Sequence, residues 1–309
     1  MLKLERLKAI GYSMTRNEVD PKEDKKMFKL SPSRTSKLAK EALPPKVNFN
    51  FEINEARLIP SNIFLLTHKC GNNYVQNVFR LSENKLIQFQ TDEMRGQMPG
   101  PYIGDGINLL GGFENIRCRN FTSLSIEKLL RSIDLRETRF FLFVRHPASL
   151  FRSAVSYHIR GGEKWATKNR YSYLNNRTLT QALNEAKDLE ARLIITMTHF
   201  GILWRLTDNW LNCYHYLTLL GANLTLIKTE DVFSDGDDYY FQSLSEKMSH
   251  DGFSISSDHL KAASPKYMDK LPPHSTGEFK KDPLDGYTGK SLEMYNQYFL
   301  QCEQFFYAD

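Results

Sequence analysis

Residues 62–73 read NIFLLTHKCGNN, and this stretch decides the fold class. Its first part, Asn62–Thr67, is a short apolar run with the length of a buried strand. A turn that contains Gly71 follows, and Tyr74–Leu81 then repeats apolar residues at helical spacing. The stretch therefore predicts a strand, a loop and a helix in succession.

The same order recurs further along the chain. Arg139–Val144 (RFFLFV) is a second apolar run, and Pro147 behind it suits the first turn of a following helix. Leu224–Lys228 (LTLIK) is a third such run, preceded by a helical pattern from about Leu179 to Leu220. Apolar strands that alternate with helices predict an α/β fold, in which helices flank a central parallel sheet on both faces.

Composition and charge fit a single folded domain with a basic arm. The 309 residues are 41% hydrophobic and include 20 Phe and 15 Tyr, enough for a sizeable core. Residues 1–50 hold 12 Lys and Arg against 6 Asp and Glu, so the rest of the chain contributes −1 to the total of +5. We predict a basic N-terminal arm at residues 1–46 and one domain at residues 47–309. A near-neutral domain argues against nucleic acid as a partner.

Membrane, export and metal signals are weak. The chain holds no run of about eighteen apolar residues, and its start, MLKLERLKAIGYS, has no apolar signal core, so we expect a cytoplasmic protein without a membrane span. The cysteines form no CxxC pair, which is typical of free thiols. Only His68 and Cys70 set two potential metal ligands close together, whereas a structural zinc needs about four. We therefore expect no metal.

The loop Thr67–Asn73 has the features of an anion site. Between a strand and a helix, it aims backbone N–H groups and the positive end of the helix dipole at one point, which suits a phosphate. Gly71 lets the backbone approach closely, and Lys69 adds a mobile positive charge. The pattern of the nucleotide-triphosphate P-loop, GxxxxGK[ST], is absent. By itself the loop also fits a purely structural turn.

A second motif is Arg145-His146-Pro147 followed by Ser153, eight residues after the arginine. Arg145 would lie at a strand end, and Ser153 would share a helix face with Ser149 and Ser156. An arginine fork and a hydroxyl that converge on one point suit a phosphate dianion. The structural alternative is an ion pair for Arg145 and a packing role for Ser153.

In this order the motifs resemble those of sulfotransferases that use 3′-phosphoadenosine 5′-phosphosulfate (PAPS). Lys69-Cys70-Gly71-Asn72-Asn73 is similar to the family's Lys–Ser–Gly–Thr–Thr-like loop, which binds the 5′-phosphosulfate. Arg145, Pro147 and Ser153 match its Arg-x-Pro signature with a later Ser, which binds the 3′-phosphate. Lys228-Thr229-Glu230-Asp231-Val232 is similar to the family's late strand-plus-Glu-Asp segment, and Gly277-Glu278-Phe279-Lys280 is similar to its Gly–acidic–Trp–basic cofactor loop.

The resemblance spans roughly Ile63 to Lys281. It implies a P-loop-like fold and the reaction that the family catalyses. The reaction is transfer of a sulfuryl group from PAPS to a hydroxyl or amine of a small-molecule acceptor, such as a natural product, which leaves 3′-phosphoadenosine 5′-phosphate (PAP) and needs no metal. Asn72 and Asn73 replace the hydroxyl residues usual in the family. No Arg-Lys-Gly precedes Gly277, so Lys280 or Lys281 is expected to hold the adenosine end.

Lys69 is the residue expected to meet the negative charge that builds on the bridging oxygen. An acceptor hydroxyl also needs a base. The segment Asp92–Arg119 lies between the two cofactor motifs, where the family tends to place its base, and it contains no histidine. We therefore expect Asp105 or Glu114 to be the base. His158 is expected to pack structurally and is the next candidate.

Two other functions stay open. A P-loop-like kinase with ATP and magnesium would need a Walker lysine loop and a metal-holding Asp, and neither is found in register. A non-catalytic nucleotide-binding protein is compatible with Asn72 and Asn73 in the first loop. No motif specifies the acceptor or an oligomeric state.

Overall fold

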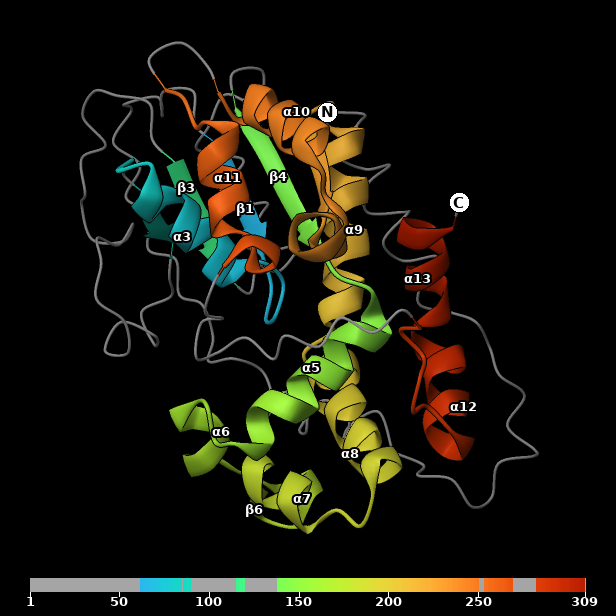
Figure 1. Cartoon of the computed structure of the whole chain (residues 1–309). Coiled ribbons are helices and arrows are strands. Elements are labelled where there is room, and N and C mark those ends of the chain that lie inside the picture. The colour runs from blue at the N-terminus through green and yellow to red at the C-terminus, as the bar shows by residue number, and fades with distance from the viewer. Residues whose placement is uncertain are drawn as a thin grey trace, which may run out of the picture. The chain divides into compact units, whose positions relative to one another are not determined.

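The computed structural model describes residues 62–84, 86–89, 115–119, 138–249, 253–268 and 282–308. The arm at residues 1–46 and its boundary lie outside this part of the chain and stay predictions. The described residues form an α/β fold with a five-stranded sheet in the order β2-β3-β1-β4-β7, flanked by helices (Figure 1). This confirms the predicted fold class.

All neighbouring strands of this sheet are parallel. Strand β1 (Asn62–Leu66) lies at its centre, between β3 (Asn115–Arg119) and β4 (Arg139–Val144). Strand β2 (Leu86–Phe89) pairs with β3, and β7 (Asn223–Lys228) pairs with β4. Because β1 and β4 are adjacent and parallel, the loops that follow them leave the sheet at the same edge.

The helices connect and cover the strands. Helix α3 (Asn72–Leu81) follows β1, and α5 (Pro147–Ile159) follows β4 with proline in its first turn, as predicted. The other regular elements are α6 (Lys164–Lys168), β5 (Arg170–Tyr171), β6 (Arg177–Thr178), α7 (Leu179–Glu185), α8 (Leu189–Thr196), α9 (Leu206–Leu219), α10 (Asp238–Met248), α11 (Ser257–Ala263), α12 (Gly289–Tyr298), α13 (Leu300–Tyr307), the 3₁₀ turns Ser172–Leu174 and Pro265–Tyr267, and the π-helical turns Met197–Leu203 and Asp231–Asp235.

The expectation of one helical stretch from Leu179 to Leu220 is wrong. Asp188 starts a new helix, α8, because its carboxylate accepts the backbone N–H of Ala191 at 2.8 Å. Arg205 has a left-handed φ of 52°, which a continuing right-handed helix cannot accommodate. These breaks let α8 pack on α5 and α12, while α9 packs on β4 and β7.

The core forms around the two central strands. Ile63–Leu66 and Phe140–Val144 are buried, and the Phe64 ring stacks on the Phe141 ring with centroids 5.1 Å apart. Their continuous apolar sequence reflects a sheet that is covered on both faces. Among the described helices, none combines the length and apolarity needed to cross a membrane.

Candidate functional site

The first part of the site is the loop between β1 and α3. The carbonyl oxygen of Thr67 accepts the Cys70 N–H at 3.2 Å and the side-chain amide of Asn72 at 2.8 Å. Lys69 and Gly71 both take left-handed backbone angles, with φ of 63° and 74°. The main chain therefore curls tightly in front of α3, as in turns that bind anions.

The side chains of this loop differ in what they can contact. The Cys70 side chain is fully buried, and burial raises the pKa of its thiol to about 12, so Cys70 offers a ligand only its main chain. The Asn72 amide is held by Thr67, whereas Asn73 is exposed. No side chain caps the first turn of α3 among the described residues. Binding of a 5′-phosphosulfate by the N–H groups of Gly71, Asn72 and Asn73 remains a prediction.

Gly71 is required by both its backbone angle and its surroundings. A Cβ at Gly71 would lie 2.6 Å from Cδ1 of Phe143, whereas Gly221, with φ of 69°, has nothing within 4 Å of its Cβ position. We expect Gly71→Ala to lower the free energy of unfolding by roughly 2–4 kcal/mol, from backbone strain and overpacking together. The matched control Gly221→Ala should lose only the strain, about 1–2 kcal/mol. Urea unfolding measures both, and equal losses would contradict the close packing of the loop on Phe143.

Lys69 lies in an unusual environment for a lysine. Its Nζ is 2.9 Å from the centroid of the Tyr157 ring, a cation–π contact. Burial lowers the pKa of Lys69 to about 7, with Glu163 opposing this shift and Arg145 and Arg160 adding to it. The ammonium is therefore about half deprotonated at neutral pH, and a bound anion beside it would favour the charged form.

In the structure, the second motif lies next to the first. Arg145 is buried at the end of β4, and its Nη1 donates a hydrogen bond to the Lys69 carbonyl oxygen at 3.3 Å. Ser153 lies in the second turn of α5. It is buried, and Ser149 and Ser156 on the same helix face are half-buried. Two sequence motifs 76 residues apart thus meet at one edge of the sheet.

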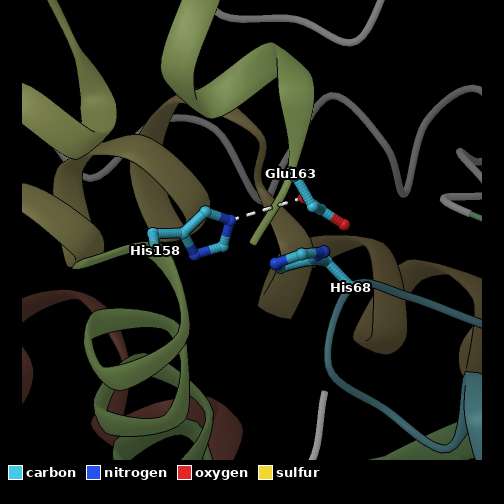
Figure 2. A group of neighbouring side chains, drawn as sticks. All are labelled: His68, His158 and Glu163. Atoms are coloured by element: carbon cyan, nitrogen blue, oxygen red, sulfur yellow. Dashed lines mark hydrogen bonds and ion pairs between the residues drawn. The ribbon is translucent and has the colours of Figure 1, made fainter. Parts of the chain in front are cut away.

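A side-chain cluster beside Lys69 was not predicted. His68, His158 and Glu163 point toward one another (Figure 2), and their potential ligand atoms all lie within 4.8 Å. His158 Nδ1 lies 2.8 Å from the Ala154 carbonyl oxygen, and its Nε2 lies 3.4 Å from Oε2 of Glu163. A carbonyl oxygen only accepts, so Nδ1 carries a proton. The other ring nitrogen, Nε2, therefore faces the Glu163 carboxylate, which also lies beside His68.

Aromatic rings and charges hold this cluster together. The His68 ring stacks on Phe200 with centroids 4.8 Å apart, and the His158 ring lies 5.2 Å from the Trp165 ring. Burial alone would favour the neutral form of Glu163, but His68, His158 and Lys69 outweigh it and lower the pKa of Glu163 to about 2. Glu163 is thus a carboxylate at neutral pH, shared among these three groups.

The structure adds to two sequence-based expectations here. His68 and Cys70 are neighbours in the sequence, but in the structure the Cys70 side chain is buried in the core and His68 faces His158 and Glu163. His158 is buried, as expected, and its ring also contacts Glu163. The overlooked signal is Gly161, which takes a left-handed φ of 68° after α5 and reverses the chain, so that Glu163 returns to His158.

Several predicted site residues lie outside the described part of the chain. They are the base candidates Asp105 and Glu114 and the residues expected at the adenosine end, Gly277, Lys280 and Lys281. Their roles stay predictions.

Comparison with known proteins gives distant structural similarity and no match by sequence. No family model matches the chain, and no curated protein matches it by sequence. Among solved structures, the chain is similar to the crystal structure of mouse sulfotransferase SULT7A1 complexed with PAP. The two sequences are 10% identical, the match covers 86% of this chain and 89% of the mouse chain, and the TM-score is 0.46. A similarity this distant identifies no function, so the function has to be argued from the site.

Proposed function

We propose that the protein is a sulfotransferase that transfers a sulfuryl group from PAPS to a hydroxyl or amine of a small-molecule acceptor and releases PAP. The observation that carries this proposal is the contact between Arg145 and the Lys69 carbonyl oxygen. It joins two loops that each suit an anionic group, one at the start of α3 and one at the start of α5. A nucleotide with separate 5′ and 3′ anionic groups fits such a pair better than ATP, whose phosphates form one chain.

The residues divide the work of holding PAPS. The backbone N–H groups of Gly71–Asn73 and the dipole of α3 hold the 5′-phosphosulfate. Arg145 and Ser153 hold the 3′-phosphate through a charge-assisted fork and a hydroxyl. Lys280 and Lys281 are proposed at the adenosine end. The two ends fix the register of the nucleotide and direct its sulfur toward Lys69.

Transfer breaks the bond between sulfur and the bridging oxygen and forms a bond between sulfur and the acceptor oxygen. Lys69 stabilises the negative charge that develops on the bridging oxygen, which leaves with PAP. The acceptor proton must go to a base. We propose His68, because it directly precedes Lys69 in the loop and lies beside the Glu163 carboxylate, which stabilises the imidazolium that forms. Asp105 and Glu114 are the alternative bases.

Calorimetric titration without added metal tests the proposal. We expect PAP to bind at least about tenfold more tightly than ADP, a difference of ~1.4 kcal/mol, because only PAP carries a 3′-phosphate. Arg145→Ala should remove most of this preference and Ser153→Ala a smaller part. Equal affinity of the wild type for PAP and ADP would contradict a PAPS site. ATP binding that depends on magnesium would favour a kinase, and PAP binding without turnover would favour a non-catalytic nucleotide-binding protein.

A chelator arm of the same titration tests whether the cluster of His68, His158 and Glu163 works with a bound metal ion. Zinc also uses histidine and carboxylate ligands, so the cluster has the chemistry of a metal site. We expect dialysis against a chelator to leave PAP binding and turnover intact, because the proposed transfer uses no metal. Loss of turnover that zinc restores would assign the cluster to a metal ion instead.

A further inference from the structure

Glu230 has no part in the mechanism above, yet it connects three segments at the site. It follows β7, the strand next to β4. Its Oε1 accepts the backbone N–H of His146 at 3.1 Å, and its Oε2 accepts the Tyr307 hydroxyl hydrogen at 2.8 Å. One carboxylate therefore joins the C-terminal helix α13 to the residue that follows Arg145.

Helix α13 contacts the same loop through side chains as well. The Tyr307 ring lies 5.1 Å from the His146 ring. Oε2 of Glu303 lies 3.7 Å from Nε2 of His146 and also accepts the hydroxyl of Tyr295. His146 is thus held at its main chain by Glu230 and at its ring by α13.

Because His146 directly follows Arg145, the contacts of His146 also fix the direction of the loop that carries Arg145. Pro147 has no N–H, so the His146 N–H is the last main-chain donor before α5 that can fix the direction of the loop. The buried Arg145 side chain reaches the Lys69 carbonyl oxygen at 3.3 Å and depends on that direction. Burial, and then the charge of Glu230, raises the pKa of Tyr307 well above its usual value, so its hydroxyl stays a donor.

We propose that Glu230 and Tyr307 are positioning residues through which α13 holds the loop that presents Arg145 to the 3′-phosphate. The identity of the ligand rests on the proposed function, whereas the holding of the loop does not. On this proposal, α13 controls affinity for the 3′-phosphate through the position of Arg145.

Four variants and two readouts test this role. The variants are Glu230→Ala, Glu230→Gln, Tyr307→Phe and a control, Tyr298→Phe. Tyr298 lies on α12 and is 50% exposed. The first readout is hydrogen exchange of the His146 amide in the free protein, measured by NMR. The second is the Kd of PAP and of ADP from calorimetry, together with kcat at saturating PAPS. Thermal unfolding checks that each variant is folded.

Glu230→Ala should speed exchange at His146 and weaken PAP by roughly tenfold, because it removes a hydrogen bond to a charged acceptor. The Kd of ADP should change by less than about threefold, and kcat should stay near the wild-type value, since Lys69 and His68 are untouched. Tyr307→Phe should have a smaller effect in the same direction. Glu230→Gln should restore most of the PAP affinity, because its amide oxygen still accepts the His146 N–H. Tyr298→Phe should change nothing.

Other outcomes overturn the inference. Wild-type exchange at His146 and wild-type PAP affinity in Glu230→Ala would show that the carboxylate does not hold the loop. Equal weakening of PAP and ADP would indicate a general loosening of the protein. If the wild type itself fails to distinguish PAP from ADP while Glu230→Ala still exposes the His146 amide, the proposed function fails and the loop-holding role of Glu230 stands.

Discussion

Lys69→Ala is expected to reduce turnover at saturating PAPS by about a hundredfold or more, the loss typical of a group that stabilises transition-state charge. Lys69 is held at the start of α3 by a left-handed backbone and by contact of its ammonium with the Tyr157 ring. The variant loses the cation that would meet the bridging oxygen as its bond to sulfur breaks. Steady-state kcat measures this loss, and calorimetry should find a much smaller weakening of PAP.

Two controls make the Lys69 experiment specific. Lys168→Ala removes an exposed lysine from α6 and should leave kcat unchanged. Lys69→Arg keeps the charge but replaces a compact ammonium by a planar fork, so only part of the activity should return. Near-normal turnover of Lys69→Ala would exclude the proposed role.

The pH dependence of PAP binding follows from the same residue. The pKa of Lys69 is about 7 in the free protein, so its ammonium is mostly charged at pH 6 and mostly neutral at pH 8. An anionic ligand binds the charged form and raises this pKa, so binding at pH 8 must take up a proton. PAP affinity should therefore fall as the pH rises through about 7, by no more in total than Lys69→Ala weakens it. Lys69→Ala should lose this dependence.

The central strands could be predicted from the sequence because they are buried on both faces. The Arg139–Val144 run coincides with β4. The edge strand β7 is only partly buried, and its apolar run still predicted it to within one residue at its start. Strands β2 and β3 were not predicted, because neither has the sequence of an apolar run of strand length. Leu86–Phe89 is only four residues long, and Asn115–Arg119 alternates apolar residues with arginines, so neither is an apolar run.

The parts of the site that depend on the order of strands and helices along the chain could be predicted. The parts that depend on contacts between residues far apart in the sequence could not. The loops after β1 and β4 could be singled out because the carboxyl ends of parallel strands meet at one edge. The hydrogen bond from the Tyr307 hydroxyl to the Glu230 carboxylate joins residues 77 positions apart, and no local sequence pattern predicts it. Glu163 is close in sequence to His158, but their contact depends on the reversal of the chain at Gly161.

His68→Asn is expected to lower kcat for an aliphatic alcohol acceptor by roughly 10²–10⁴-fold, the range for loss of a general base. The His68 ring is fixed on Phe200 and lies beside Glu163, so the carboxylate would stabilise the proton that His68 takes from the acceptor. PAP affinity should stay close to that of the wild type, because the loop N–H groups and Arg145 remain. His215→Asn, whose ring packs on Phe305 at the surface of α9, is the matched control and should keep full activity.

The acceptor decides how strongly turnover depends on this base. A phenol of low pKa loses its proton readily, so His68→Asn should affect it far less than the alcohol, while Lys69→Ala should affect both because both break the same sulfur–oxygen bond. Glu163→Gln should lower turnover of the alcohol by a smaller factor, since it leaves His68 in place but removes the charge that stabilises the imidazolium. Asp105→Asn and Glu114→Gln belong in the same assay. If either variant abolishes turnover of the alcohol while His68→Asn stays active, the base is Asp105 or Glu114. The cluster of His68, His158 and Glu163 then has another role.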